Sequence, residues 1–132
     1  MFKFKYIYIL LISVFIIGCT KDEEDDHTHQ NEVTFSIQNP VEGQDFGNGD
    51  TIFMKGTVTA TESLHGYELV IKDLSNGSTL FTDSDHVHGN TLTLDKFFVN
   101  KVVSPRQLAI TFKVAIDHDG NTAEKVVKVN AK

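Results

Sequence analysis

Hydrophobic and polar residues alternate along most of the chain after residue 32, and a period of two is typical of β-strands. The segment 107–116 is the clearest case, because Leu108, Ile110 and Phe112 alternate there with smaller or polar residues. Alternation and short apolar runs predict further strands at 33–38, 51–60, 66–73, 78–83, 91–99 and 122–130. Each such strand has one buried face and one exposed face, as in antiparallel sheets.

Turn-forming residues separate these segments. Asn76-Gly77 is the dipeptide of tight hairpins, and Gly120 stands where a turn needs a positive φ. About seven strands with turns every 8–12 residues are typical of a β-sandwich. We therefore predict an all-β fold, with residues 33–132 as one antiparallel sandwich. The chain has ten phenylalanines and no tryptophan, so we expect phenylalanine to fill the core.

Two long segments resemble Ig-like domains of bacterial envelope proteins. They are NPVEGQDFGNGDTIFMKGTVTA at 39–60 and ITFKVAIDHDGNTAEKVVKV at 110–129. The resemblance implies an Ig-like sandwich over most of 33–130. It implies no function, because this fold hosts many unrelated tasks. The chain has no Cys…Trp…Cys trio, which excludes an antibody-type domain.

Residues 1–18 have the composition of a secretory signal peptide. Lys3 and Lys5 precede an apolar run that is shorter than the roughly 20 residues of a membrane span. The residues Ile16-Ile17-Gly18-Cys19 resemble a bacterial lipobox, in which the cysteine is acylated and becomes the new N-terminus. The resemblance implies a lipoprotein lipidated on Cys19. This is the only cysteine, so the chain can form no internal disulfide.

The segment 19–32 is polar and acidic after Cys19, and Asp22 to Asp26 are all acids. Such a run repels itself and buries too little surface to fold, so we predict a flexible tether. Lys21 followed by acids resembles the export signal of surface lipoproteins in Bacteroidota-type bacteria. A plain charged linker is the alternative. The whole layout also resembles a domain family of unknown function, namely Ig-like lipoproteins of such bacteria with clustered histidines.

The charge of the chain bears on its partners and its location. Removal of residues 1–18 takes away two lysines and no acid, so the net charge of −6 becomes −8. An acidic chain without a basic stripe argues against nucleic acid as a partner. Attachment to the membrane then depends on the lipid anchor. We expect the protein in the cell envelope, at the outer membrane, on its surface-exposed or periplasmic face.

Four of the six histidines are predicted to meet at one end of the sandwich. In an Ig-like arrangement the loops that follow 51–60, 78–83 and 107–116 lie at the same end, and they carry His65, His86, His88 and His118. Residues two apart in an extended segment point the same way, so His86 and His88 could share an ion. Further ligands would be Asp85, Asp117 or Asp119. Nitrogen-rich sites of this kind suit Zn²⁺, Cu²⁺ or Ni²⁺.

The alternative is that these histidines are ordinary polar loop residues. His118 would then be a spacer in a turn whose aspartates bond the backbone. His27 and His29 stand beside the acidic run of the tether and are more typical of solvated residues. Asp117, Asp119 and Asn121 are similar to the start of a calcium loop, but the closing glutamate of such a loop is absent, so a β-turn is favoured.

The chain carries no motif of an enzyme. It lacks G-x-S-x-G, H-E-x-x-H and any phosphate-binding glycine loop. We therefore predict a lipid-anchored, non-enzymatic Ig-like binding module of the cell envelope, with a protein or a glycan as ligand. The alternative is an envelope lipoprotein that binds Zn²⁺, Cu²⁺ or Ni²⁺ through the histidine cluster. The sequence leaves the ligand, the membrane leaflet and the oligomeric state open.

Overall fold

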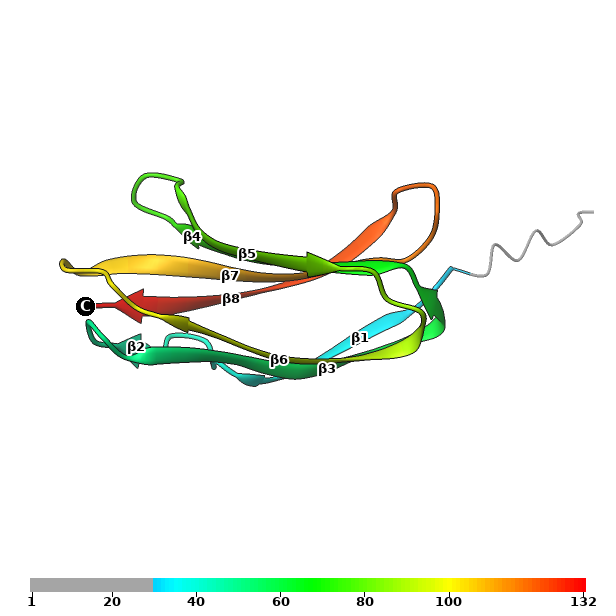
Figure 1. Ribbon diagram of the computed structural model, residues 1–132, viewed down its shortest axis with the longest axis horizontal. Helices are drawn as coiled ribbons and strands as arrows, with labels where there is room; N and C mark the ends of the chain where they lie inside the picture. Colours follow the sequence, from blue (N-terminus) through cyan, green and yellow to red (C-terminus); the bar gives the residue numbers. More distant parts are fainter. Residues whose placement is uncertain (1–29) are drawn as a thin grey trace, which may run out of the picture.

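The computed structural model describes residues 30–132, which form two β-sheets packed face to face (Figure 1). The three-stranded sheet has the order β1-β3-β6 and contains β1 (Val33–Asn39), β3 (Thr51–Leu64) and β6 (Gly89–Val99). The five-stranded sheet has the order β2-β8-β7-β4-β5 and contains β2 (Asp45–Phe46), β8 (Thr122–Ala131), β7 (Arg106–Ala115), β4 (Gly66–Asp73) and β5 (Thr79–Asp85). The predicted all-β, Ig-like sandwich is thus confirmed.

The seven predicted strands are all present, with small differences at their ends. β3 continues to Leu64, four residues beyond the prediction, and β6 begins two residues earlier, at Gly89. β2 was not predicted. It lies where the chain passes from one sheet to the other and pairs in parallel with Asn130 and Ala131 of β8, whereas the other strand pairs are antiparallel. A strand of two residues is too short to show alternation.

The predicted alternation correctly identifies the buried faces. Ile52, Met54 and Val58 of β3 are fully buried, as are Leu108 and Ile110 of β7. Gly56 lies between the buried residues of β3 because β1 comes very close at this point. A Cβ atom there would stand 2.8 Å from the carbonyl oxygen of Ser36, which is closer than real Cβ contacts. The glycine therefore lets two neighbouring strands pair without displacing β1.

The expectation that phenylalanine fills the core is wrong for two residues. Phe53 of β3 and Phe97 of β6 are direct partners in the sheet and are 48% and 63% exposed on its outer face. The Lys55 ammonium lies 5.3 Å from the Phe53 ring centroid. Strand alternation decides this placement, because Phe53 stands between the buried residues Ile52 and Met54.

The domain starts slightly before the predicted boundary at residue 33. Asn31 is buried, its Nδ2 donates to the Ile116 carbonyl oxygen (3.1 Å), and its Oδ1 accepts from the Glu62 amide (2.9 Å). The end of the predicted tether is therefore fixed to the sandwich. The signal peptide, Cys19, the acidic run, His27 and His29 lie outside the described residues. No helix within residues 30–132 has the length and apolar character needed to cross a membrane.

One side of the sandwich, where β5 and β6 are the edge strands, is closed by a polar and aromatic network. Asp83 of β5 accepts a hydrogen bond from the Tyr67 hydroxyl (2.6 Å) and forms an ion pair with Lys96 of β6 (2.9 Å). Phe81 and Phe98 pack edge to face beside them, with ring centroids 6.0 Å apart. The hydrogen bond from Tyr67 and then the Lys96 ammonium lower the pKa of Asp83. This network connects the two sheets through side chains.

Candidate functional site: a polar recess beside a histidine pair

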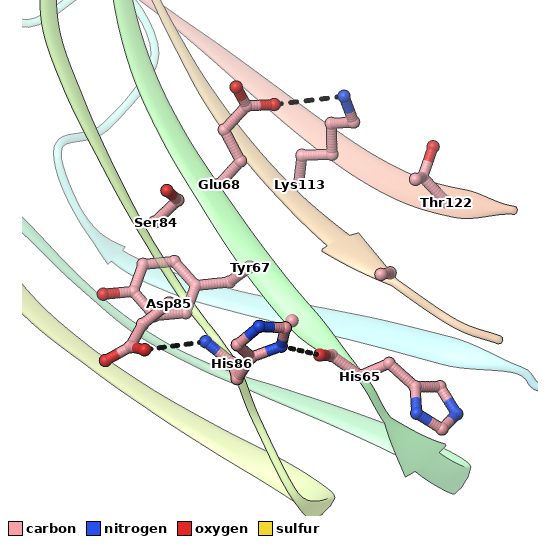
Figure 2. Close-up of a pocket in the computed structure, with 10 residues that line it drawn as sticks. His65, Tyr67, Glu68, Ser84, Asp85, His86, Lys113 and Thr122 are labelled. Carbon is pink, nitrogen blue, oxygen red and sulfur yellow. Dashed lines mark hydrogen bonds and ion pairs between the residues drawn. The ribbon is translucent and has the colours of Figure 1, made fainter. Parts of the chain in front are cut away.

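The outer face of the five-stranded sheet is hollowed at one end. The recess has a volume of about 460 Å³ and lies over β4, β5, β7 and the start of β8 (Figure 2). Gly66 and Ala115 are direct partners in the β4–β7 ladder, and both belong to its lining. Because these residues have the two smallest side chains, this rung of the sheet forms a low floor between larger neighbours. Gly66 also tolerates the close approach of β5, where a Cβ atom would stand 3.3 Å from the Asp85 carbonyl oxygen.

Polar side chains of both charges surround this floor. On the next rung Glu68 and Lys113 are partners, and the Lys113 ammonium lies 3.1 Å from a Glu68 carboxylate oxygen. Ser84 faces them from β5 and Thr122 from β8 (Figure 2). The side chains of Glu68 and Lys113 are 43% and 37% exposed, so this ion pair contributes little to stability and can exchange partners with a ligand.

His86 borders the recess and is held by contacts with Asp85 and His65. Its amide donates to the Asp85 carboxylate (2.8 Å), and its Nδ1 lies 3.4 Å from the His65 carbonyl oxygen. A carbonyl oxygen only accepts hydrogen bonds, so this contact requires a proton on Nδ1. In the neutral ring Nε2 is then an acceptor that remains for a ligand.

The loops converge as the sequence suggested, but the four histidines do not form one group. The rings of His65 and His118 lie against each other in a tilted arrangement, with centroids 3.9 Å apart and planes inclined by 46°. His86 contacts the backbone of His65, and in Figure 2 the His65 ring lies on the opposite side of that carbonyl. His88 is exposed and does not line the recess. Within residues 30–132 no three His, Cys, Asp or Glu side chains are arranged to hold a metal ion.

The aspartates of the β7–β8 turn have a structural role. The Asp117 carboxylate accepts hydrogen bonds from the amides of Asp119 (2.9 Å) and Asn121 (3.0 Å) and from the Asn121 side chain (2.6 Å). These bonds, chiefly the one from the Asn121 side chain, lower the pKa of Asp117. Asp117 thus stabilises the turn, as the alternative interpretation of the sequence predicted, and both of its carboxylate oxygens accept hydrogen bonds from within the turn. Asp119 is exposed outside the recess.

Sequence reasoning missed most residues of the recess. Gly66, Glu68, Lys113 and Ala115 were treated only as strand residues, because their proximity depends on the register between β4 and β7. Sequence alone does not fix that register. One signal was available, because Gly66 and Ala115 are small residues at strand ends that the predicted topology brings to the same end as His65 and His118.

Comparisons with known proteins give a likeness of fold only. No protein-family model matches the sequence, and no curated protein matches it. Among solved structures, the fibronectin(III)-like modules of Clostridium thermocellum CbhA are similar, with 18% identity, a TM-score of 0.46, and coverage of 75% of this chain and 96% of theirs. The β-glucuronidase of Parabacteroides merdae is similar with 12% identity and a TM-score of 0.48. That match covers 76% of this chain and 13% of the enzyme.

Proposed function

We propose that this protein is a lipid-anchored binding module of the cell envelope, and that its recess holds a hydroxyl-rich ligand such as a sugar unit of a glycan. The observation that carries the proposal is the hollow over Gly66 and Ala115, which is rimmed by Glu68, Lys113 and His86. Sugar hydroxyls both donate and accept hydrogen bonds. A rim that offers a carboxylate, an ammonium, a hydroxyl and an imidazole matches both roles.

The anchoring part of the proposal rests on the N-terminal sequence. The apolar leader, Gly18-Cys19 and the acidic segment that follows together favour export and acylation. Acyl chains provide firm membrane attachment, since each buried methylene contributes about 0.8 kcal/mol. Cells fed a labelled fatty acid should incorporate it into the wild-type chain and not into Cys19→Ser. Equal labelling of both chains would contradict lipidation at this residue.

The ligand is tested by filling the recess. The full chain, purified in a mild detergent, is applied to an array of bacterial and host glycans, together with Ala115→Leu. The leucine occupies the floor of the recess without touching the core, so we expect at least tenfold weaker binding of any glycan that the wild type selects. Ala109→Leu is the matched control, because Ala109 lies on the same face of β7 but outside the recess.

Two results would contradict this function. Glycans that bind wild type and Ala115→Leu equally would place the ligand elsewhere on the molecule. An array without any bound glycan, from a chain whose folding is verified by thermal unfolding, would reject the ligand class.

A second candidate function, transition-metal binding, is favoured by the contact between His65 and His118. Two imidazoles with centroids 3.9 Å apart can turn to share one Zn²⁺, Cu²⁺ or Ni²⁺ ion. Metal content is measured after a metal soak and desalting, at about pH 7.5 and about pH 5.5, on either side of the ordinary imidazole pKa of about 6.5. One ion per chain at the higher pH, lost in His65→Ala and retained in His88→Ala, would support this function. A metal-free protein at both pH values would exclude it.

A further inference from the structure

The side of the sandwich opposite the β5–β6 network has an apolar groove. The groove has a volume of about 510 Å³ and is lined by residues of β1 in one sheet and of β8 in the other. Figure 1 shows these two strands in separate layers of the sandwich. Phe35 and Ile37 of β1 and Val127 of β8 line it, together with Pro40 and Val41 of the segment that follows β1. Phe35 and Ile37 are only partly buried, although both point toward the core. The apolar layer between the sheets is thus open to solvent here.

Within the described part of the chain, the backbone of β8 is also unpaired along most of this side. β2 covers only Asn130 and Ala131. Just before this pair, the Lys128 amide donates to the Glu42 carboxylate (2.9 Å), and the Lys128 carbonyl oxygen accepts from the Gly43 amide (2.7 Å). Lys128 therefore directs its backbone groups away from β7. Successive residues of a strand alternate in this direction, so Val126 and Glu124 do the same.

No strand within the described residues 30–132 pairs with these outward groups of Val126 and Glu124. An edge with free amides and carbonyls beside an apolar groove is the surface to which an extended peptide adds as a further strand. Main-chain hydrogen bonds supply affinity in such a complex, and alternate side chains enter the groove. The region from Thr122 to Val127 spans about 20 Å at roughly 3.3 Å per residue, which is enough for a peptide of about six residues.

Charge narrows the choice of peptide. Lys125 lies two residues before the buried Val127, on the same face of β8, and it lines the groove and is exposed. It makes no ion pair with another residue of the described chain. Glu42 also lines the groove, and its carboxylate already accepts a hydrogen bond from the Lys128 amide. The one cation of the groove lining thus lies where a carboxylate of the ligand would meet it.

We infer that the edge of β8 is a second binding site, which takes an extended polypeptide segment of a partner protein. The segment carries apolar side chains at alternate positions, which pack on Phe35, Ile37 and Val127, and an acidic side chain that pairs with Lys125. It hydrogen-bonds to Val126 and Glu124 and extends the five-stranded sheet. This site shares no lining residue with the recess proposed to bind a glycan.

The probe is a phage-displayed library of seven-residue peptides in which alternate positions are apolar. It is selected on the full chain in a mild detergent. We expect enriched peptides with an acidic residue near one end, and at least tenfold weaker binding to Val126→Pro. Proline removes the outward amide of Val126, and it is tolerated at an edge position where that amide has no partner.

A second variant, Lys125→Glu, separates peptide recognition from misfolding because it changes only a side chain at the groove. This variant should bind the acidic peptides at least tenfold more weakly than the wild type does. It should instead bind derivatives of these peptides in which the acidic residue is replaced by lysine. Three results would overturn the inference. They are a library without enrichment, peptides that bind wild type and Val126→Pro equally, and peptides insensitive to Lys125→Glu. If a second copy of this chain binds at the same edge, the protein should dimerise, and Val126→Pro should abolish the dimer. That result would also overturn the inference, because the occupant would be this chain and not a partner protein.

Discussion

The two open sides of the sandwich differ in the chemistry of their edges. On the β5–β6 side, Asp83, Lys96 and Tyr67 form a charged network between the sheets, and Phe81 covers the core against Phe98. On the β1–β8 side, Phe35 and Ile37 border a groove, and the nearest cation, Lys125, has no ion-pair partner within residues 30–132. Within residues 30–132, both sides end in strands with unpaired backbone groups. Among these residues, only the β5–β6 side has an ion pair that joins the two sheets.

This difference shows how an edge can be closed or left available. Charged side chains along an edge strand discourage another strand from pairing with it, because pairing would desolvate them. Asp83 and Lys96 act in this way on the β5–β6 side. The β8 edge instead combines free backbone groups with apolar side chains, which is the combination that favours strand addition.

The largest expected effect comes from proline at two neighbouring positions of β8. Lys125 and Phe112 are partners in the β7–β8 ladder, and the Lys125 backbone faces β7 because Val126 faces outward. Lys125→Pro removes a ladder hydrogen bond and leaves its acceptor on β7 without a partner, which should lower the free energy of unfolding by about 1–3 kcal/mol. Val126→Pro should change it by less than about 0.5 kcal/mol. Chemical denaturation measures both, and similar losses would contradict the assigned direction of the backbone.

The next largest effect is the difference in stability loss between two phenylalanine-to-alanine variants, one from each side of the sandwich. Phe81 and Phe35 both pack against the core, but among residues 30–132 only Phe81 has an aromatic partner, Phe98. An aromatic pair adds about 0.5–1.5 kcal/mol beyond area burial. Phe81→Ala should therefore destabilise the protein by about 1 kcal/mol more than Phe35→Ala. Equal midpoints of urea unfolding for the two variants would contradict this expectation, because they would show that Phe35 is packed as tightly as Phe81.

The Tyr67 hydroxyl tests the polar part of the network. Tyr67→Phe removes the 2.6 Å hydrogen bond to Asp83 but keeps the ring, so we expect a loss of about 1 kcal/mol. The loss should shrink when Asp83 is already replaced by asparagine, because the two residues share one interaction. Thermal unfolding of the two single variants and the double variant provides this cycle. Strictly additive losses would mean that the hydroxyl and the carboxylate are independent.

The smallest effect is a dependence on pH. The folded-state pKa of Asp83 lies below its unfolded value, so the network contributes stability above the unfolded value of about 3.9 and loses it as the pH falls further. Desolvation, and then the bond to Asp83, raises the pKa of Tyr67, which contributes stability below its unfolded value of about 10 and loses it at higher pH. Asp83→Asn should flatten the acid decline of the melting temperature. If the melting temperature of Asp83→Asn falls with acid as it does in the wild type, the loss of stability arises from other carboxylates, such as Asp73, whose pKa is also lowered.

The alternation of apolar and polar residues predicted the fold well, because the burial of one face of each strand determines the residue type at every second position. Ile52, Met54 and Leu108 were placed correctly in the core on period alone. The turn at Asp117 followed from its sequence, and Gly120 has the expected positive φ of 92°. The topology also brought His65 and His118 into contact, although their sequence separation gives no direct signal.

The sites depend on features that a single sequence does not encode locally. The recess requires the register of Gly66 with Ala115, and the groove requires that β1 pair with β3 rather than with β8. Both are long-range choices, which the free energy of the whole sandwich decides. The proposed metal ligands were predicted from residue type and loop position, which leave side-chain direction undetermined. His88 shows this, because it shares its loop with His86 yet lies outside the recess.

Amide hydrogen exchange of the full chain in detergent, without added peptide, tests most directly whether the β8 edge is available. The amides of Glu124 and Val126 should exchange rapidly, while those of Lys125 and Val127 are protected by β7. Protection should therefore alternate with a period of two along this strand. Uniform protection across 124–127 would mean that the edge is already covered, and it would contradict the account of β8 as a free binding edge.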